Sequence, residues 1–257
     1  MSQSLSDGAV AALTGGYGDI GFAVARKLRQ AGFRVALGDV KSGEHLAGRA
    51  LDEFYFHALD VRDEQSVTSW FDAIGAHFGE PAALIVANAG IVRPGSALDT
   101  PGRDWSETLA VNLTGAWLTA RVGAQRLLAA GRPGRIVFIG SWTGHAPHVH
   151  LAAYCAAKAG LRMIMQCLAL ELADKDILVN EVAPGYVDAG LSAQFFRADP
   201  QLAEQSRAVV PVHRLIDVEE IASAVAYLCE PGHRNLTGNT LVIDGGLSLL
   251  RAPKTQR

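Results

Sequence analysis

The sequence predicts an α/β protein in which a doubly wound parallel sheet of about seven strands is covered by helices on both faces. Short apolar runs alternate along the chain with longer segments of helical periodicity. These runs are apolar at successive positions, as is typical of parallel strands that are buried on both faces and joined by right-handed crossovers. The length of 257 residues suits one large domain, spanning residues 1–257, better than two domains with separate cores.

The individual elements follow from these runs in chain order. The apolar runs predict strands at Val10–Leu13, Arg34–Leu37, Phe54–Leu59, Ala83–Ala87, Arg135–Ile139, Leu178–Val182 and Thr240–Ile243. The segments between them predict helices at Ile20–Ala31, Glu64–Phe78, Asp104–Ala130, Leu151–Leu172 and Val218–Leu228. Residues 184–212 are longer than a simple connection and carry aromatic residues and prolines. We expect this segment to contain a short helix and to act as a lid over a substrate.

Composition argues against several classes of protein. Hydrophobic residues make up 49% of the chain and charged residues 19%, and the net charge is -3. This balance suggests neither a nucleic-acid partner nor binding to an acidic membrane. No apolar run approaches the roughly 18 residues of a membrane span, and no basic start precedes the first apolar residues. We therefore expect a cytoplasmic protein with a small-molecule substrate, whose three cysteines form neither a metal nor a disulfide pattern.

A glycine-rich turn follows the first predicted strand. The sequence Thr14-Gly15-Gly16-Tyr17-Gly18-Asp19-Ile20-Gly21 places glycines where backbone N–H groups can approach a pyrophosphate at a helix start. Asp39 ends the second strand some twenty residues later, where a carboxylate can accept hydrogen bonds from the ribose of an adenosine. Together they predict a dinucleotide cofactor. The carboxylate favours NAD over NADP, although Lys41 lies close enough in sequence to blur the preference.

Tyr154-x-x-x-Lys158 is the most chemically informative spacing in the chain. Residues four apart share a helix face, so the phenol and the ammonium should lie side by side. An adjacent cation favours the phenolate and lowers the pKa of the tyrosine from its usual value near ~10. Tyr154 could then take a proton from an alcohol. The same spacing is also a common surface pair, and the assignment needs other motifs.

Those motifs occur in order along nearly the whole chain, from Ala9 to Gly246. The sequence resembles the short-chain dehydrogenase/reductase superfamily in its glycine loop, in Asp60-Val61, in Asn88-Ala89-Gly90 and in Asn112 within VNLTG. It continues to resemble that family in Ser141, Tyr154-x-x-x-Lys158, Val179-Asn180, Pro184-Gly185 and the terminal IDGG. The resemblance implies a Rossmann-type fold and an oxidoreductase whose hydride chemistry belongs to a nicotinamide cofactor.

The resemblance also implies roles for single residues. It makes Asn112, Ser141, Tyr154 and Lys158 a catalytic tetrad, in which Ser141 orients the substrate oxygen and Tyr154 exchanges its proton. Lys158 would lower the phenol pKa and hold the nicotinamide ribose, and Asn112 would anchor a water chain. The cofactor-binding residues implied are Gly15, Tyr17, Gly18, Asp19, Ile20, Gly21, Asp39, Asp60, Val61, Asn88, Ala89, Gly90, Tyr154, Lys158, Pro184, Gly185 and Val187.

Structural alternatives stand beside these roles. Asn112 alone would more often satisfy a turn, and a serine such as Ser141 at a strand end is usually structural. Asp60 could equally begin a turn, and Asn88 could be a buried partner of backbone groups.

The chain also departs from the family pattern at two positions. Asp19 replaces a glycine and would either repel the pyrophosphate or act as a helix N-cap. Ala189 replaces a threonine that contacts the nicotinamide carboxamide, with Ser192 as a substitute.

The resemblance implies that the loop after Asn88-Ala89-Gly90 and the segment between Ser141 and Tyr154 border the substrate, with Tyr186 approaching from the lid. An arginine offers forked donors for a carboxylate, and a tryptophan face can stack on a sugar ring. We therefore expect a sugar, a polyol or a hydroxy acid. The same border contains His145, His148 and His150. The alternative is that Arg93 is a solvated loop residue and that these histidines pack the lid. No metal is predicted. The substrate-binding residues implied are Arg93, Ser141, Trp142, His145, His148, Tyr154 and Tyr186.

The function that these observations favour is NAD-dependent oxidation of a secondary alcohol. A 3-oxoacyl-(acyl-carrier-protein) reductase remains an alternative, although it should prefer NADPH and show a basic docking surface. A non-catalytic nucleotide-binding regulatory protein is a second alternative, against which the intact tetrad argues. The helices Asp104–Ala130 and Leu151–Leu172 carry more apolar residues than one covered face needs, and the family pairs them between subunits. We therefore expect a homotetramer with Trp105 and Trp117 at or near the interface.

Overall fold

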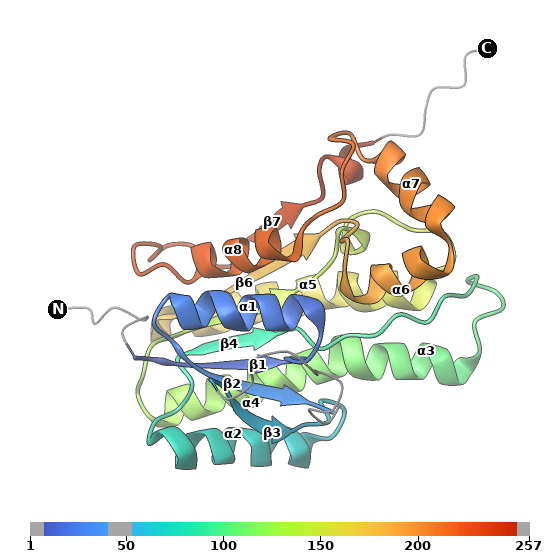
Figure 1. The fold of residues 1–257 in the computed structure, drawn as a ribbon. Helices are drawn as coiled ribbons and strands as arrows, with labels where there is room; N and C mark the ends of the chain where they lie inside the picture. The colour runs from blue at the N-terminus through green and yellow to red at the C-terminus, as the bar shows by residue number, and fades with distance from the viewer. Residues whose placement is uncertain (1–7, 41–52, 251–257) are drawn as a thin grey trace.

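The computed structural model describes residues 8–40 and 53–250, and these residues form a seven-stranded parallel sheet (Figure 1). The strand order is β3-β2-β1-β4-β5-β6-β7. The order reverses between β1 and β4, and in open α/β sheets ligands bind at the carboxyl ends of the strands near such a point. The predicted fold class is confirmed. The strands are β1 Val10–Thr14, β2 Arg34–Asp39, β3 Tyr55–Ala58, β4 Leu84–Ala87, β5 Gly134–Ile139, β6 Ile177–Pro184 and β7 Thr240–Ile243.

Helices cover both faces of the sheet, as Figure 1 shows. Alternate residues of β1 enter two different cores, because side chains of a strand point to opposite faces in turn. Val10 and Ala12 pack on the side of α2, α4 and α5, whereas Ala11 and Leu13 pack on the side of α1 and α8. The helices of these two layers are α1 Asp19–Gln30, α2 Glu64–Phe78, α4 Ala116–Ala129, α5 Ala152–Leu172 and α8 Val218–Leu228.

Local signals in the sequence set where these helices begin and end. The Asp63 side chain accepts a hydrogen bond from the Gln65 N–H and so caps the start of α2, and Gly79 ends that helix in the left-handed conformation with φ 78°. Asp217 and Glu220 form a reciprocal capping box at the start of α8. These caps explain why the predicted bounds of both helices agree with the structure.

The helix predicted over Asp104–Ala130 is not uniform. It consists of α3 Gly102–Leu109, a π-helical segment Ala110–Gly115 and α4. A π-helical turn has i→i+5 hydrogen bonds and is wider than an α-helical turn. A Cβ at Gly115 would come within 2.6 Å of the Val61 side chain, so the absence of a side chain there lets the segment pack closely. The π-helical segment contains Asn112.

Two helices, rather than the one short helix expected, follow β6. They are α6 Gly190–Ala198 and α7 Pro200–Val209. Asp199 separates them because its extended backbone and its side chain cap α7, while Pro200 occupies the first turn. Figure 1 shows both helices beyond the carboxyl end of β6. They therefore border the edge of the sheet at which a ligand is expected.

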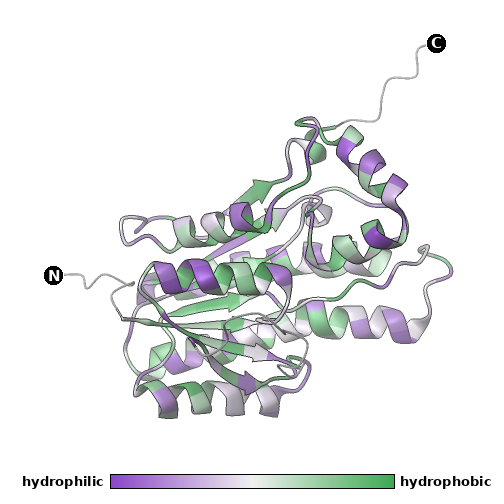
Figure 2. Cartoon of the chain, in the orientation of Figure 1, coloured by the Kyte–Doolittle hydropathy of each residue, from purple (hydrophilic) through white to green (hydrophobic). Residues whose placement is uncertain are grey.

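Hydropathy follows this layered arrangement (Figure 2). Strands in the middle of the sheet are predominantly hydrophobic, whereas α7 carries hydrophilic residues along its length. Among the described residues, no helix combines the length and the hydropathy that crossing a bilayer requires.

Candidate active site

The carboxyl end of β5 and the start of α5 bring three of the predicted catalytic side chains together. Ser141 follows β5 after one glycine, Tyr154 lies in the first turn of α5, and Lys158 lies one turn later. Ser141 and Lys158 are both buried, at 6% and 4% exposure. A loop containing a short 3-10 turn, Trp142–Gly144, connects the two elements. This loop sets how Ser141 faces the helix.

The hydroxyl of Ser141 has a defined direction. Its Oγ accepts hydrogen bonds from the Thr143 N–H at 3.2 Å and from the Thr143 hydroxyl at 3.0 Å. The Ser141 proton therefore remains available for another acceptor, and a hydrogen bond from Ser141 lowers the pKa of Tyr154. Sequence reasoning did not identify Thr143. A serine followed two residues later by another hydroxyl was the available signal, because such a pair commonly forms a turn.

Tyr154 does not have the lowered pKa that its spacing from Lys158 predicted. Burial raises the pKa of Tyr154 to about 12, and this effect outweighs the hydrogen bond with Ser141. The prediction of a lowered Tyr154 pKa is therefore wrong for the protein without a bound cofactor. The physical reason is that a phenolate loses its hydration in this partly enclosed position, and helix spacing says nothing about that loss.

Lys158 lies beside Tyr154 but its ammonium is held elsewhere. Its Nζ donates a hydrogen bond to the Ile139 carbonyl at 2.7 Å and lies 5.5 Å from the centroid of the Tyr154 ring. Burial lowers the pKa of Lys158 to about 8, while the charge of Glu181 acts in the opposite direction. The predicted side-by-side placement is confirmed.

Asn112 reaches the same region from the π-helical segment. Its side chain is fully buried, its Nδ2 donates to the carbonyls of Ile91 and Thr108 at 2.9 Å, and its Oδ1 accepts from the Ile91 N–H at 3.2 Å. The amide thus fastens the loop after β4 to α3. This supports the structural alternative for Asn112.

The glycine-rich turn between β1 and α1 leaves room for a ligand against the backbone. Gly15 has φ +66°, and a Cβ at Gly21 would lie 2.2 Å from the Gly15 carbonyl oxygen. Gly18 is the N-cap of α1 and has no side chain that could cap this helix start. Uncapped N–H groups at a helix N-terminus favour a phosphate, so the turn fits a dinucleotide. Asn88 supports the turn, since its Nδ2 donates to the carbonyls of Thr14 and Gly15 at 2.9 and 3.1 Å.

Asp39 lies at the end of β2 beside this turn. Its carboxylate accepts a hydrogen bond from the Tyr17 N–H at 3.0 Å, and the residue is 8% exposed. The Tyr17 ring stacks on Phe56 with centroids 4.5 Å apart. The carboxylate is therefore held in place by backbone of the glycine-rich turn. Lys41, which could modify its effect, lies outside the described residues.

The remaining predicted cofactor residues line the same edge of the sheet. Asp60 forms a turn and pairs with Arg62, which holds the pKa of the Asp60 carboxyl below its usual value. This supports the turn interpretation of Asp60. At the end of β6 the Gly185 N–H donates to the Ile243 carbonyl at 2.8 Å. The other residues of this edge are Ile20, Val61, Ala89, Gly90, Pro184 and Val187, of which Val61, Pro184 and Val187 are buried.

Asp19 has a partner that the sequence did not suggest. It belongs to the first turn of α1, whose N-cap is Gly18, so the prediction that Asp19 is an N-cap is wrong. Its Oδ2 instead accepts a hydrogen bond from the Gly190 N–H at 2.8 Å. Ala189 precedes α6 and has no side-chain oxygen to cap that helix. A carboxylate on α1 therefore supplies the negative group at the start of α6.

We expect Asp19→Ala to loosen α6, because the N–H of Gly190 loses its acceptor. Hydrogen exchange of the peptide over residues 189–198 should become faster, and the free energy of unfolding should fall by about 1 kcal/mol. Asp199→Ala is the matched control, since it removes the cap of α7 only. Unchanged protection of the Gly190 amide in Asp19→Ala would show that the bond is not maintained in solution.

Three aromatic side chains form a wall beside the tetrad. The Trp142 ring contacts His148 and Tyr186 in edge-to-face geometry, each with centroids 5.7 Å apart. The His148 Nε2 lies 2.9 Å from the Tyr186 hydroxyl. Trp142 also packs with Val210 and Leu247, so segments far apart in sequence hold this wall in place. These three predicted substrate residues contact one another, Trp142 directly follows Ser141, and the His148 carbonyl lies 3.9 Å from the Sγ of Cys155, the residue after Tyr154.

The other predicted substrate residues have different partners. His145 Nδ1 lies 2.6 Å from the guanidinium of Arg162, and burial lowers the pKa of His145. His150 is exposed and has a left-handed backbone with φ 62°. Arg93 donates to Glu107 at 3.2 Å and both side chains are partly exposed. No three His, Cys, Asp or Glu side chains gather to hold a metal ion in the described part of the chain.

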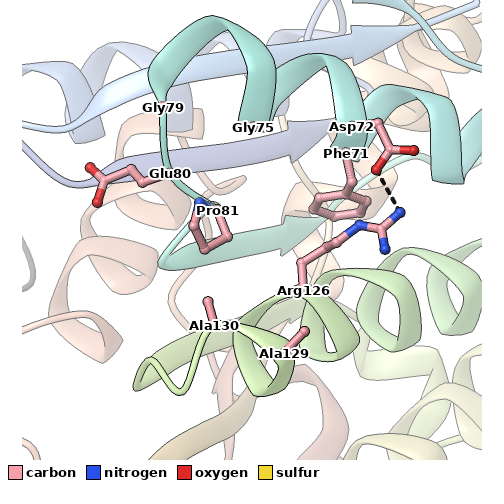
Figure 3. Close-up of a pocket in the computed structure, with 9 residues that line it drawn as sticks. All are labelled: Phe71, Asp72, Gly75, Gly79, Glu80, Pro81, Arg126, Ala129 and Ala130. Atoms are coloured by element: carbon pink, nitrogen blue, oxygen red, sulfur yellow. Dashed lines mark hydrogen bonds and ion pairs between the residues drawn. The ribbon is translucent and has the colours of Figure 1, made fainter.

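A separate hollow of about 420 Å³ lies between the carboxyl-terminal ends of α2 and α4 (Figure 3). It is lined by Phe71, Pro81 and Arg126 among others, and Arg126 pairs with Asp72 at 2.6 Å at its margin. Helices of a parallel α/β sheet run back to the amino ends of the strands, so this hollow lies at the opposite edge from Tyr154. We assign it no part in the chemistry.

Comparison with known proteins identifies relatives that match nearly the whole chain. The model of the family described as "Enoyl-(Acyl carrier protein) reductase" matches residues 17–248. The chain is 36% identical to a cis-4-hydroxycyclohexanecarboxylate dehydrogenase of Sinomonas cyclohexanicum, over 92% of this chain and 95% of that protein. It is 33% identical to a 2,3-dihydroxy-2,3-dihydro-p-cumate dehydrogenase of Pseudomonas putida, over 95% and 96%. A crystal structure of an actinorhodin polyketide ketoreductase variant with NADPH has a TM-score of 0.88 and 30% identity, over 95% and 98%.

The parallel sheet, with its glycine-rich turn at the topological switch point, is the architecture of dinucleotide-dependent oxidoreductases. Two of the relatives are named as dehydrogenases of hydroxylated rings, and the chain is an oxidoreductase of this class that acts on CH–OH groups and binds a nicotinamide cofactor. Because the family match spans nearly all of its length, the chain belongs to the short-chain dehydrogenase/reductase superfamily. The predicted family is thereby confirmed.

Proposed function

We propose that the chain is an NAD-dependent dehydrogenase that oxidises a secondary alcohol on a polar ring, such as that of a sugar, a cyclic polyol or a cyclic hydroxy acid. The observation that carries this proposal is the aromatic wall of Trp142, His148 and Tyr186 beside Ser141 and Tyr154. Aromatic faces and edges suit the apolar side of a ring, while the imidazole and phenol offer hydrogen bonds to its hydroxyls. The cyclic alcohols in the names of two relatives support the same substrate class.

Each side chain of the tetrad has a distinct part in this proposal. The Ser141 hydroxyl, already fixed by Thr143, orients the oxygen of the alcohol. Tyr154, as the phenolate, would take the proton from that oxygen while the carbinol hydrogen leaves with its electron pair as a hydride. Lys158 supplies positive charge beside the phenol and so opposes the effect of burial on its pKa. Asn112 keeps the loop after β4 in place. The cofactor supplies the hydride acceptor when it is bound.

Cofactor binding belongs to the carboxyl edge of the sheet in this proposal. The turn around Gly15, Gly18 and Gly21 would hold the pyrophosphate, and Asp39 would bind the adenosine ribose. Lys158 would hold the nicotinamide ribose. The rest of the binding surface would comprise Tyr17, Asp19, Ile20, Asp60, Val61, Asn88, Ala89, Gly90, Tyr154, Pro184, Gly185 and Val187. We further propose that residues 184–212, with α6 and α7, close over the substrate as a lid.

Substitution of Arg93 tests whether the substrate carries an acid group. Its pair with Glu107 is exposed, and such pairs contribute only about 0–1 kcal/mol, so a substrate carboxylate can replace Glu107 at little cost. We expect wild-type kcat/KM to be higher for cis-4-hydroxycyclohexanecarboxylate than for the neutral cyclohexanol analogue. Arg93→Ala should lower this ratio by about tenfold.

The measurement is initial rates of cofactor reduction with a panel of cyclic and linear alcohols and both cofactors. Arg103→Ala, which removes another exposed arginine paired with a neighbouring acid, is the matched control. An unchanged ratio in Arg93→Ala would remove Arg93 from the substrate site. A wild-type preference for long aliphatic alcohols would overturn the ring proposal. The description of the matching family also favours a carrier-linked acyl substrate, and faster reduction of a 3-oxoacyl thioester with NADPH would replace the proposal by that function.

We also propose a homotetramer. Met163, Cys167 and Leu170 form an exposed stripe on one side of α5, with Met163 57% and Leu170 84% exposed. A second exposed apolar surface would lie at the edge of the sheet, where Val242 of the last strand, β7, is 37% exposed. A tetramer with dihedral symmetry needs at least two self-complementary surfaces, and these two would provide them.

Light scattering after size exclusion should therefore give the mass of four chains. Replacing both Met163 and Leu170 by Glu should reduce that mass to two chains, because one of the two surfaces is lost while the other remains. Leu98→Glu is the control, since Leu98 is 95% exposed but belongs to neither surface. A monomer at micromolar concentration in the wild type would contradict the proposed assembly.

A further inference from the structure

Glu181 is an acid in the middle of β6 that is completely buried, at 0% exposure. Its side chain points to the sheet face covered by α5, because Val179 two residues earlier packs in that core. A carboxyl in such a position is costly to bury unless it has partners of opposite charge or hydrogen-bond donors. The reaction steps given above do not use this residue.

The carboxyl of Glu181 has one direct hydrogen bond and one close backbone neighbour. Its Oε2 accepts a hydrogen bond from the Thr240 hydroxyl at 2.7 Å. Its Oε1 has no hydrogen-bond partner among the described residues, and a Cβ placed on Gly140 would lie 1.7 Å from this oxygen. The carboxyl therefore lies directly against Gly140, where only a glycine leaves enough space.

Gly140 occupies a critical place in the active site. It connects Ile139, whose carbonyl accepts the hydrogen bond from the Lys158 ammonium, to Ser141. Contact between Glu181 and Gly140 thus supports the backbone on both sides of Gly140. Ile139 on one side anchors Lys158, and Ser141 on the other side orients the substrate oxygen. The packing of α5 against β6 places Lys158 above the same strand.

Charged groups on α5 face the carboxyl of Glu181. Lys158 and Arg162, one helical turn apart, both favour its ionised form, whereas burial raises its pKa. In turn the charge of Glu181 raises the pKa of Lys158 against the effect of burial. Arg162 also contacts His145, and the charge of Asp244 acts on that imidazole. Tyr154 also lies beside Lys158, with its ring centroid 5.5 Å from the Lys158 Nζ.

We propose that Glu181 is a positioning residue of the active site, whose carboxylate keeps the Lys158 ammonium protonated and fixes the backbone at Gly140. The proposal rests on the proposed function, in which Lys158 must carry a positive charge beside Tyr154. Without a counter-charge, the buried ammonium loses its proton at lower pH. Glu181 thereby extends upward the pH range in which the tetrad is correctly charged.

Glu181→Gln tests this proposal because the amide retains the size of the side chain and an oxygen for Thr240. NMR of protein labelled with ¹³C at the Cε of its lysines gives the titration midpoint of Lys158 without substrate or cofactor. The signal is identified by its loss in Lys158→Met. We expect a midpoint near pH 8 in the wild type and a midpoint lower by at least about one pH unit in Glu181→Gln. Glu171→Gln, an exposed position on α5, should leave it unchanged.

Thr240→Val provides a second variant that keeps the carboxyl. It removes only the donor to Oε2, so the ionised form of Glu181 becomes less stable and the midpoint should shift in the same direction by a smaller amount. In active enzyme the alkaline limb of kcat/KM should move to lower pH with the NMR midpoint. A midpoint that is unchanged in both variants would overturn the proposal. Since the midpoint is measured without turnover, that result is distinct from a failure to oxidise any alcohol, which would overturn the proposed function.

Discussion

Replacing Tyr154 by Phe is expected to lower kcat/KM for alcohol oxidation by about 10²- to 10⁴-fold, the contribution typical of a positioned proton acceptor. The phenyl ring retains the packing at the start of α5, and the backbone that faces the cofactor is unchanged. Cofactor affinity should therefore stay within about a factor of three of the wild type. Initial rates and calorimetric titration with NAD measure the two quantities separately.

Tyr55→Phe is the matched control for this substitution. Tyr55 lies in β3 and its ring stacks on His77, far along the sheet from Ser141. Removal of its hydroxyl should leave kcat/KM unchanged. If the Tyr154→Phe enzyme kept a rate close to the wild type, another group would have to accept the proton, and the mechanism proposed for the tetrad would be wrong.

A change of cofactor preference is the second large effect that we expect. The wild type should use NAD better than NADP, because the 2′-phosphate of NADP would lie beside the carboxylate of Asp39. Two unit charges about 4 Å apart near a protein surface repel by roughly 4 kcal/mol, and part of this is screened. Asp39→Asn should therefore raise the ratio of kcat/KM for NADP to that for NAD by about 100-fold.

The asparagine in this variant retains an oxygen that can accept the hydrogen bond from the Tyr17 N–H, so the glycine-rich turn should stay intact. Asp174→Asn, in the turn before β6, removes an exposed carboxylate at the opposite, amino edge of the sheet and should leave the ratio unchanged. Equal kcat/KM for the two cofactors in the wild type would defeat the assignment of Asp39.

The features that the sequence predicted well depend on short-range patterns. The alternation of apolar runs and helices led to the parallel sheet, because each strand is buried on both faces. The four-residue spacing of Tyr154 and Lys158 placed both on one side of α5, and the cap at Asp63 set the start of α2. In these cases the partners lie within one or two helical turns.

The features that sequence reasoning missed depend on burial and on contacts between distant segments. The pKa of Tyr154 rises because the tertiary structure encloses the phenol, which no spacing reveals. The Asp19 carboxylate accepts a hydrogen bond from the N–H of Gly190, which lies 171 positions later in the chain. The π-helical segment Ala110–Gly115 falls within the single helix that the sequence predicted over Asp104–Ala130. In the sequence, Glu181 is a charged residue inside an apolar strand. Its role as a positioning residue depends on the close approach of Gly140, which only the structure shows.

Transfer of deuterium from the alcohol to the cofactor tests the central claim most directly. The wild-type enzyme would be incubated with NAD and cis-4-hydroxycyclohexanecarboxylate carrying deuterium on the carbinol carbon, and the reduced cofactor would be analysed by mass spectrometry. We predict reduced nicotinamide that carries one deuterium, together with the corresponding ketone. Unlabelled reduced cofactor, or no reduction with this or any other deuterated secondary alcohol while NAD binds, would contradict direct hydride transfer at this site.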